Sequence, residues 1–330
     1  MLSTSDRDLE KAAAALIAGK LVAFPTETVY GLGADAFNQS ALARIFEAKD
    51  RPRFDPLIIH IAELKTLWRI ADESALNKAT VERLSILSER LWPGPLTLIL
   101  PKRREVPDLA TSALTTAAIR FPSHPVAQKL IRLSTGAVAA PSANLFGRLS
   151  PTRAAHVKAQ LGDKVDYIID GGKTTVGLES TVLDLSRDVP AILRQGGTER
   201  EKIEALIGPV EASCDSLSDA PHSPGQLKSH YAPRTPLVLC KREEMEAAPF
   251  ASGEGRLYFS HPKTESILID RVRVLSEVGN VTEAAANFFD CLHELDSLGL
   301  DFIRAEEAPS CGLGEAINDR LRHASVAWSN

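Results

Sequence analysis

The stretch FPTETVYGLGAD, residues 24–35, decides how the rest of the chain is interpreted. The apolar run LVAF, residues 21–24, leads into it and has the composition of a buried strand. Pro25 cannot donate a ladder hydrogen bond, so we expect the strand to end there. Hydroxyl-bearing, acidic and small residues follow, and Gly31 and Gly33 are suited to a tight turn. The stretch therefore predicts polar side chains gathered just beyond the end of a buried strand.

Similar polar clusters accompany other apolar segments. Arg120 ends TAAIR and is followed by FPSHP, and PSANLFGRLSPT follows the apolar run AVAA. GLESTVLDL places Glu179 and Ser180 directly before another apolar run. Because ligands of α/β proteins gather at strand ends, we expect these clusters to meet in one site.

Apolar runs alternate with helical patterns up to residue 207, which predicts an α/β domain. The expected strands are LVAF (21–24), LIIHI (57–61), LTLIL (96–100), TAAIR (116–120), AVAA (137–140), VDYIID (165–170), STVLDL (180–185) and AILRQ (191–195). The expected helices are an N-terminal one with Leu9, Ala12, Ala13, Leu16 and Ile17 on its apolar face, one capped by Asn38, and those over 76–91, 151–161 and 199–207. Ser150 is the expected cap of the helix over 151–161, with proline at its first position.

The run from 208 to 236 is rich in proline, serine, histidine and glycine, which is typical of a linker. Beyond it PLVLC, RLYFS and VRVL predict strands, and residues 281–298 predict a helix. We therefore expect a large α/β domain over 1–208, a linker over 209–235 and a small α/β domain over 236–330.

The composition excludes several classes of protein. The chain has 330 residues, 44% of them hydrophobic, and a formal net charge of -5, so the overall charge gives no reason to expect tight nucleic-acid binding. The 4 cysteines form no C-x-x-C pair, which favours reduced thiols in a cytoplasmic protein over a zinc site or a disulfide framework. No apolar run is long enough to span a membrane.

Basic residues fall beside the polar clusters. AKDRPRFDP carries Lys49 and Arg51, and Arg120 and Arg194 end apolar strands, where an unpaired charge is unfavourable. The planar fork of arginine binds two oxygens of a carboxylate or phosphate at once. This pattern predicts an anionic ligand, such as a nucleotide.

Each signal also has a structural interpretation when taken alone. His60 in an apolar strand is more often a hydrogen-bonded core residue than a ligand, and Ser142 and Asn144 suit turns or caps. Glu27 and Glu179 could simply pair with arginines. The convergence of the clusters, rather than any one residue, favours a functional site.

Taken in order, FPTETVYGLGADA, AKDRP with DPLIIHI, LWPGPLTLIL, TAAIRFPSHP, APSANLFGRLSPT and GLESTVLDL resemble the YrdC/Sua5 family. Its members are threonylcarbamoyl-AMP synthases. SPGQLKSHYAPRTP in the linker and GLGEAINDRLRHAS near the end resemble the longer Sua5-type branch, so the resemblance covers nearly the whole chain.

The resemblance implies a fold and an activity. The fold is a twisted, open, mixed α/β sheet, followed by a linker that closes over the active site and a small Rossmann-like domain. The enzymes are nucleotidyltransferases that combine L-threonine, bicarbonate and ATP, with Mg²⁺ on the phosphates, into threonylcarbamoyl-AMP and pyrophosphate. A threonylcarbamoyl-transferase of the TsaD/Kae1 type then modifies adenosine 37 of tRNAs that read codons beginning with A (t6A).

The resemblance also implies roles for individual residues. The threonine pocket would comprise Thr28, His60, Arg120, Ala140 and Thr181. The nucleotide side would comprise Arg51, Asp55, Thr116, Ser142, Asn144, Ser150, Arg194 and Tyr231. Lys49 and Arg51 would be catalytic, by neutralising charge on the phosphates, and no protein side chain is expected to bind the metal directly.

Two positions depart from the family pattern. Asp55 stands where asparagine is frequent, and an aspartate would repel phosphate unless it pairs with Arg51 or Arg53 or faces the metal. Gln226 and Leu227 stand where methionine often follows SPG.

Two other functions are open on the sequence. One is a binding module whose basic concavity accepts RNA weakly, without catalysis. The other is a carbamoyl-transfer protein of hydrogenase maturation, although the zinc-finger-like cysteine motifs of such proteins are absent here.

Overall fold

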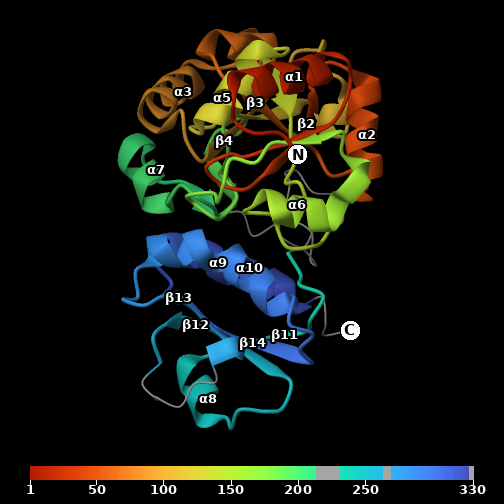
Figure 1. Cartoon of the computed structure of the whole chain (residues 1–330). Coiled ribbons are helices and arrows are strands. Elements are labelled where there is room, and N and C mark those ends of the chain that lie inside the picture. Colours follow the sequence, from red (N-terminus) through yellow and green to blue (C-terminus); the bar gives the residue numbers. More distant parts are fainter. Residues whose placement is uncertain (213–230, 263–268, 327–330) are drawn as a thin grey trace.

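The computed structural model describes residues 1–212, 231–262 and 269–326, which form two domains (Figure 1). The larger domain contains a mixed ten-stranded sheet in the order β10-β9-β8-β4-β5-β3-β6-β2-β1-β7. Its strands are β1 (Val22–Phe24), β2 (Gly31–Asp35), β3 (Ile58–Ile61), β4 (Leu96–Pro101), β5 (Thr116–Arg120), β6 (Ala137–Ala139), β7 (Tyr167–Ile168), β8 (Thr181–Asp184), β9 (Ala191–Arg194) and β10 (Glu211–Ala212). Its helices are α1 (Asp6–Ile17), α2 (Gln39–Lys49), α3 (Lys78–Leu91), α4 (Asp108–Thr111), α5 (Pro125–Leu133), α6 (Ala154–Leu161) and α7 (Arg200–Ile207), with short 3₁₀ turns at 64–69, 73–75 and 162–164.

The central strands β3, β5, β4 and β8 present different side chains to the two faces of the sheet, because successive residues of a strand point in opposite directions. One face carries Ile59, Ile119 and Leu98, which join the largest apolar core together with α2 and α3. On the other face, α1 and α5 cover the part of the sheet near β1 and β6. Over the central strands that second face carries only a small apolar cluster of Ile58, Ile99, Ala118 and Val182. The twist and partial cover of this face leave room for a cavity.

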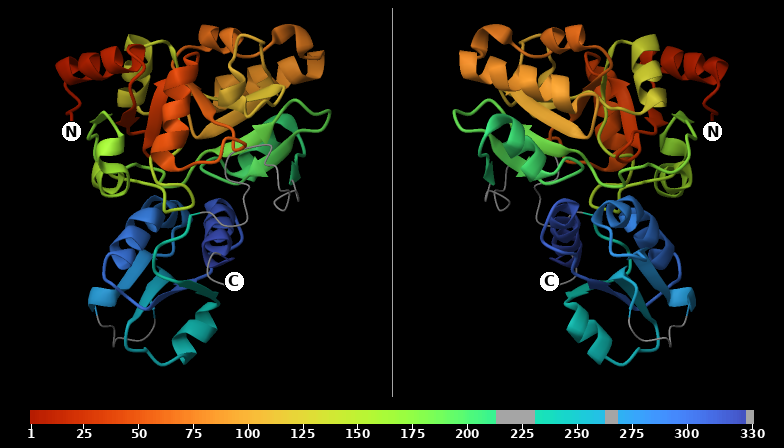
Figure 2. Two further views of the ribbon diagram at one scale, coloured as in Figure 1. Left: turned by 90° about the vertical axis from the view of Figure 1, so that its right-hand side faces the viewer. Right: turned by 90° about the vertical axis from the view of Figure 1, so that its left-hand side faces the viewer.

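The smaller domain is a parallel four-stranded sheet in the order β11-β14-β12-β13. Its elements are β11 (Leu237–Cys240), α8 (Arg242–Ala247), β12 (Glu254–Ser260), a 3₁₀ turn at 269–271, β13 (Val272–Ser276), α9 (Val281–Asp296), β14 (Phe302–Glu306) and α10 (Leu313–Val326). In Figures 1 and 2, α9 and α10 lie between this sheet and the larger domain, and α8 lies at the far end.

The apolar core around α9 and α10 extends across the domain boundary. It includes Val29, Leu149 and Leu178 of the larger domain, packed together with Phe288 and Phe289 of α9. The smaller domain therefore rests on the loops that surround the sheet's second face.

Most of the predicted elements are confirmed, including the mixed α/β sheet and the second, Rossmann-like domain. Asn38 caps α2 as expected, with its side-chain oxygen 3.1 Å from the amide nitrogen of Ala41. The apolar face of α1 is as predicted except for Ile17, which is 57% exposed. Elements β2, α4, α5, β10, α8, β14 and α10 were not predicted.

Two local predictions are wrong. Gly31 and Gly33 do not form the turn; they lie in β2, antiparallel to β1, and the turn falls at 25–30. A Cβ atom on Gly33 would lie 2.7 Å from Phe24 Cε1, so the glycine is required by close packing. Helix α6 begins at Ala154, and Arg153 occupies its N-cap position. The Ser150 hydroxyl does not cap this helix but donates a hydrogen bond to the Glu179 carboxylate.

Within the described residues, no helix combines the length and apolar character needed to cross a bilayer. Part of the predicted linker, residues 213–230, lies outside the described residues, and the structure does not bear on its role as a lid.

The close approach of the two domains can be tested at Gly177. Its φ is +75°, and a Cβ atom there would lie 2.3 Å from the Ala285 carbonyl oxygen in α9. Gly172, in the same loop, has φ +81° with open space around it. Gly172→Ala should lower the free energy of unfolding by about 1–2 kcal/mol for the left-handed backbone alone. Gly177→Ala should lower it by about 1–3 kcal/mol more through the clash, as measured by urea unfolding. Equal losses would contradict the described domain contact.

Candidate functional site

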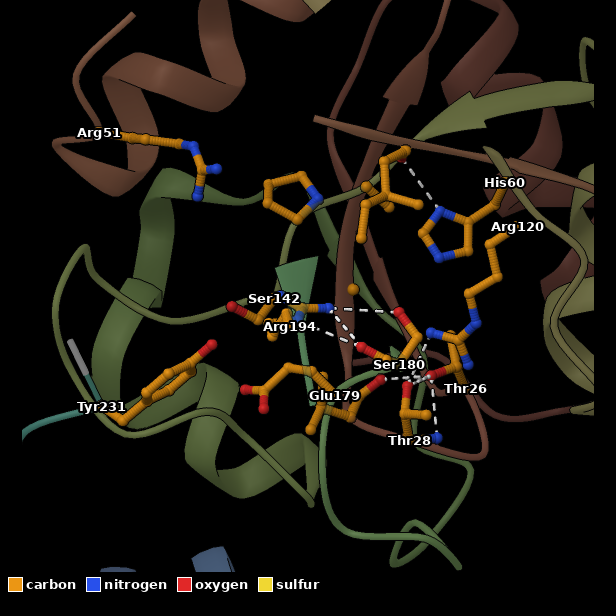
Figure 3. Close-up of a pocket in the computed structure, with 15 residues that line it drawn as sticks. Thr26, Thr28, Arg51, His60, Arg120, Ser142, Glu179, Ser180, Arg194 and Tyr231 are labelled. Atoms are coloured by element: carbon orange, nitrogen blue, oxygen red, sulfur yellow. Dashed lines mark hydrogen bonds between the residues drawn. The ribbon is translucent and has the colours of Figure 1, made fainter. Parts of the chain in front are cut away.

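A cavity opens over the central strands and gathers residues from distant parts of the chain (Figure 3). Its walls come from the turn after β1 and the start of β2, from the loop after α2, from β3 and β5, from the loop after β6, from the segment before β8, from β9 and from the described end of the predicted linker. The lining residues are Thr26, Thr28, Val29, Gly31, Arg51, Ile58, His60, Arg120, Ala140, Pro141, Ser142, Glu179, Ser180, Arg194 and Tyr231.

Strand periodicity explains why His60 and Arg120 both face this cavity. They are direct partners in the parallel ladder of β3 and β5. Each lies two residues after a member of the apolar cluster on the same face, Ile58 in β3 and Ala118 in β5. That cluster forms the floor from which the two polar side chains emerge.

Arg120 is held in place by three neighbours. Its Nη2 atom lies 2.7 Å from Glu27 Oε1, and its Nη1 atom donates to Thr28 Oγ1 at 2.8 Å. Nε lies 3.4 Å from the Gly94 carbonyl oxygen. Thr28 is fixed in turn by Thr26, whose hydroxyl oxygen is 2.8 Å from the Thr28 hydroxyl. These contacts hold the guanidinium rigidly at one end of the cavity, where it can bind a carboxylate.

His60 is neutral at physiological pH. Burial lowers the pKa of its imidazole to about 3, and the positive charge of Arg120 lowers it further than burial alone would. A neutral imidazole can donate or accept a hydrogen bond with a polar ligand without adding repulsion next to Arg120.

Arg51 faces the cavity from the loop after α2 and is paired on its other side with Asp55. Its Nη2 atom lies 2.8 Å from Asp55 Oδ2 and 2.9 Å from the Pro56 carbonyl oxygen. Burial raises the pKa of Asp55, and the charge of Arg51 opposes that rise. The pairing with Arg51 anticipated for Asp55 is thus present. Among the described residues, Nη1 of Arg51 has no hydrogen-bond partner, which leaves it available to a ligand.

Lys49 lies behind the cavity wall. Its Nζ atom donates to the carbonyl oxygens of Ser142 at 2.6 Å and Asn144 at 2.5 Å. Burial, followed by the charge of Arg51, holds its pKa well below the usual value. In this conformation Lys49 therefore supports the loop after β6, and its role as a catalytic cation stays a prediction.

Arg194 enters from the end of β9. Its Nη2 atom donates to the Ser180 carbonyl oxygen at 2.9 Å and lies 3.2 Å from the Ser180 hydroxyl. That hydroxyl is also 2.7 Å from Thr97 Oγ1 in β4. Ser180 thus orients the guanidinium of Arg194, which is a structural role. The described partners of its hydroxyl are Thr97 and Arg194, and neither is a base that would activate it as a nucleophile.

Tyr231 closes the cavity from the side of the smaller domain. It has φ +61°, a strained conformation for a bulky residue, and it is 1% exposed. The ring packs against Phe289 of α9 and His323 of α10. The smaller domain therefore fixes a residue that was predicted to meet the nucleotide.

Eight of the residues predicted for the site line this single cavity: Thr28, Arg51, His60, Arg120, Ala140, Ser142, Arg194 and Tyr231. In Figure 3, His60, Arg120 and Thr28 lie on one side, and Arg51, Ser142 and Tyr231 on the other. The residues predicted for threonine and those predicted for the nucleotide are thus separated in this view, and the ligand on each side stays a prediction.

The other predicted residues lie outside the lining. Lys49, Asp55, Asn144, Ser150 and Thr181 are buried behind it. Thr116 lies at the start of β5, opposite Pro101, whereas Arg120 lies at the end of that strand. The ligand contacts predicted for these six residues stay predictions.

Sequence reasoning assigned no site role to Thr26, Glu179 or Ser180, although PTET and GLEST had marked their segments. It also missed Arg320 of α10, whose Nε atom donates to Glu179 Oε2 at 3.0 Å. An arginine inside an amphipathic helical pattern carries no sequence signal for such a contact.

The charges suit an anionic ligand. Arg51, Arg120 and Arg194 line the cavity, and Glu179 is the one acidic residue among its described lining residues. Glu179 is already bonded to Arg320 and Ser150. Among the described residues, no group of three or more His, Cys, Asp or Glu side chains is arranged to hold a metal ion.

Comparisons with known proteins agree with this geometry. The Sua5/YciO/YrdC family model, described as telomere recombination, matches residues 14–196. The model of the threonylcarbamoyl-AMP synthase C-terminal domain matches residues 198–326. The threonylcarbamoyl-AMP synthase of Bacillus subtilis is 42% identical over 98% of this chain and 94% of its own, and that of Pyrococcus abyssi is 43% identical over 93% and 91%. The crystal structure of P. abyssi Sua5 complexed with L-threonine superposes with a TM-score of 0.87 at 40% identity, covering 97% of this chain and 95% of that one.

The buried, neutral state of His60 predicts how stability changes with pH. The folded pKa of about 3 lies below the unfolded value of 6.5, so between these values the unfolded chain binds a proton that the folded chain does not. Stability should therefore fall as the pH is lowered below 6.5. His60→Gln should flatten the dependence between pH 6.5 and 5 by up to about 1.4 kcal/mol per pH unit in urea unfolding. An unchanged slope would show that His60 is not buried in the neutral form.

Proposed function

Because the chain belongs to the Sua5/YrdC family, whose curated members are named threonylcarbamoyl-AMP synthase, we propose that it is an L-threonylcarbamoyladenylate synthase. This nucleotidyltransferase joins L-threonine, bicarbonate and ATP into threonylcarbamoyl-AMP and releases pyrophosphate. The observation that carries the proposal is the single cavity with Arg120 at one end and Arg51 and Arg194 toward the other.

The Arg120 end suits the amino acid. The guanidinium, held by Glu27 and Thr28, presents its remaining N–H groups to the carboxylate of threonine. The neutral imidazole of His60 and the hydroxyl of Thr28 lie beside it as hydrogen-bonding groups for the threonine hydroxyl and amine. Ala140 and Ile58 supply apolar contact for the methyl group.

The opposite end suits the nucleotide. Arg51 and Arg194 provide positive charge for the phosphates, and Ser142 provides a hydroxyl. Tyr231 presents an aromatic ring at the same end, where it can pack against the nucleoside. ATP would enter as its magnesium complex, with the metal carried on the phosphates, since Glu179 is the one acidic side chain in the described lining and is bonded to Arg320.

The chemistry follows from this arrangement. The amine of threonine attacks the carbon of bicarbonate, a hydroxide leaves as water after taking up a proton, and an N-carboxylate forms. An oxygen of that carboxylate then attacks the α-phosphorus of ATP, and the bond to the bridging oxygen of pyrophosphate breaks. No protein nucleophile is needed; positioning and charge neutralisation by the arginines lower the barrier. The mixed anhydride formed is readily hydrolysed, so a site that excludes water during the reaction would protect it.

The product would serve a threonylcarbamoyl-transferase of the TsaD/Kae1 type, which modifies adenosine 37 of tRNAs reading codons that begin with A. We expect this role to be cytoplasmic. The direct test of the reaction is pyrophosphate release from ATP that requires both L-threonine and bicarbonate. Release that is independent of threonine would contradict the proposed function.

The role of Arg120 can be tested with Arg120→Lys, which keeps a positive charge beside Glu27 but loses the planar fork. The KM for threonine should rise at least about 10-fold, since a bidentate charged contact is lost. The KM for ATP should stay within about twofold. Arg44→Lys, a half-exposed surface arginine paired with Asp166, is the matched control and should leave both constants unchanged. A larger effect on ATP than on threonine would show that the two ends have been assigned the wrong way round.

A further inference from the structure

The smaller domain reaches the cavity through a buried arginine. Arg320 lies in α10 and is completely buried. Its Nε atom donates to Oε2 of Glu179 at 3.0 Å, and Nη1 lies 2.5 Å from Asp319 Oδ2. Glu179 lines the cavity, so one helix of the smaller domain is bonded directly to the wall of the site in the larger domain.

The carboxylate of Glu179 links this arginine to a further predicted nucleotide residue. Its Oε1 atom accepts a short hydrogen bond from the Ser150 hydroxyl. The Ser150 carbonyl oxygen is in turn 3.0 Å from Nε2 of His293 in α9. The two helices of the smaller domain therefore hold Ser150 and Glu179 from the same side.

Arg320 also supports the aromatic residue of the site. Its guanidinium carbon lies 4.8 Å from the centre of the Tyr231 ring, which is within the range of a cation–π contact. Because Tyr231 has a positive φ, its position must be enforced by its surroundings. Arg320, Phe289 and His323 of the smaller domain all contact its ring.

The charge of Arg320 has a consequence inside the cavity. Glu179 lines the same cavity as Arg51 and Arg194, the arginines assigned to the phosphates. A buried carboxylate that lost its cation would turn toward another positive charge, since an unpaired buried charge is strongly unfavourable. Arg320 prevents this by binding Glu179 from behind the wall.

We propose that Arg320 is a positioning residue for nucleotide binding: it holds Glu179 away from the cavity arginines and fixes the Tyr231 ring. The inference rests on the proposed function for the identity of the ligand, ATP. It gives the smaller domain a direct part in organising the site, through helix α10.

The test uses the full-length protein and four variants: Arg320→Gln, Arg320→Lys, Glu179→Gln, and Arg320→Gln combined with Glu179→Gln. Calorimetry measures the affinity for an ATP analogue with a β,γ-imido bridge in the presence of Mg²⁺. Pyrophosphate release measures the KM for ATP and for threonine. Arg322→Gln, an exposed neighbour on α10, is the matched control.

Arg320→Gln should weaken analogue binding and raise the KM for ATP at least about 10-fold, with a smaller change for threonine. The combined variant should recover most of the lost affinity, because no unpaired carboxylate remains to compete for the cavity arginines, and the loss that remains should not exceed that of Arg320→Lys, which also lacks the stacking on Tyr231. Such a recovery distinguishes positioning from a general structural role, which would predict equal or greater loss in the combined variant. Unchanged binding in Arg320→Gln, or no recovery in the combined variant, would overturn the proposal.

If Arg320→Gln does not fold, the affinity of Arg320→Lys for the analogue tests the proposal instead. It keeps the charge but loses the fork and the stacking on Tyr231, and it should weaken analogue binding about 3- to 10-fold. Wild-type affinity in Arg320→Lys would then overturn the proposal. Wild-type protein that binds the analogue but shows no threonine-dependent release would contradict the synthase function and leave the inference about Arg320 to be judged by binding alone.

Discussion

Buried positive charge is the constraint on which the site depends. Arg51, Arg120, Arg194 and Arg320 are all nearly or completely buried, and each is held by a carboxylate or a carbonyl group. Three of these arginines, Arg51, Arg120 and Arg194, line the cavity, whereas Arg320 lies behind its wall and binds the lining residue Glu179. The fold thus prepares a rigid site for anions before any ligand arrives, which reduces the free energy needed to organise the transition state.

The sheet supplies the geometry for that arrangement. Its central strands bury one face in the main core and leave the other face partly uncovered. On that second face His60 and Arg120 follow apolar residues of the same strands by two positions, so both side chains lie beside the small apolar cluster at the base of the cavity. Tyr231 of the linker lines the cavity, and Arg320 of the smaller domain supports both Tyr231 and Glu179 from behind the wall. The smaller domain therefore contributes to the site through its support of the wall, and the continuous apolar core around α9 and α10 holds the two domains together.

The sequence was sufficient for most of this picture because polar residues at strand ends leave a local signature. FPTET, TAAIR and AILRQ each marked a segment whose key residue, Thr28, Arg120 or Arg194, does line the cavity. The sequence did not reveal that Gly33 lies in a strand, because the need for glycine comes from Phe24 packing across the ladder. It could not identify the pairing of Glu179 with Arg320 either, since these residues are far apart in the chain and only the tertiary fold brings them together.

In the proposed function, one cavity binds the amino acid at Arg120 and the phosphates at Arg51 and Arg194. The most direct measurement is a crystal structure of this protein with L-threonine and a non-hydrolysable ATP analogue bound together. We expect the threonine carboxylate on the Arg120 guanidinium and the phosphates against Arg51 and Arg194, with the amine directed toward the α-phosphate. Phosphates on Arg120, or the two ligands in separate cavities, would contradict it.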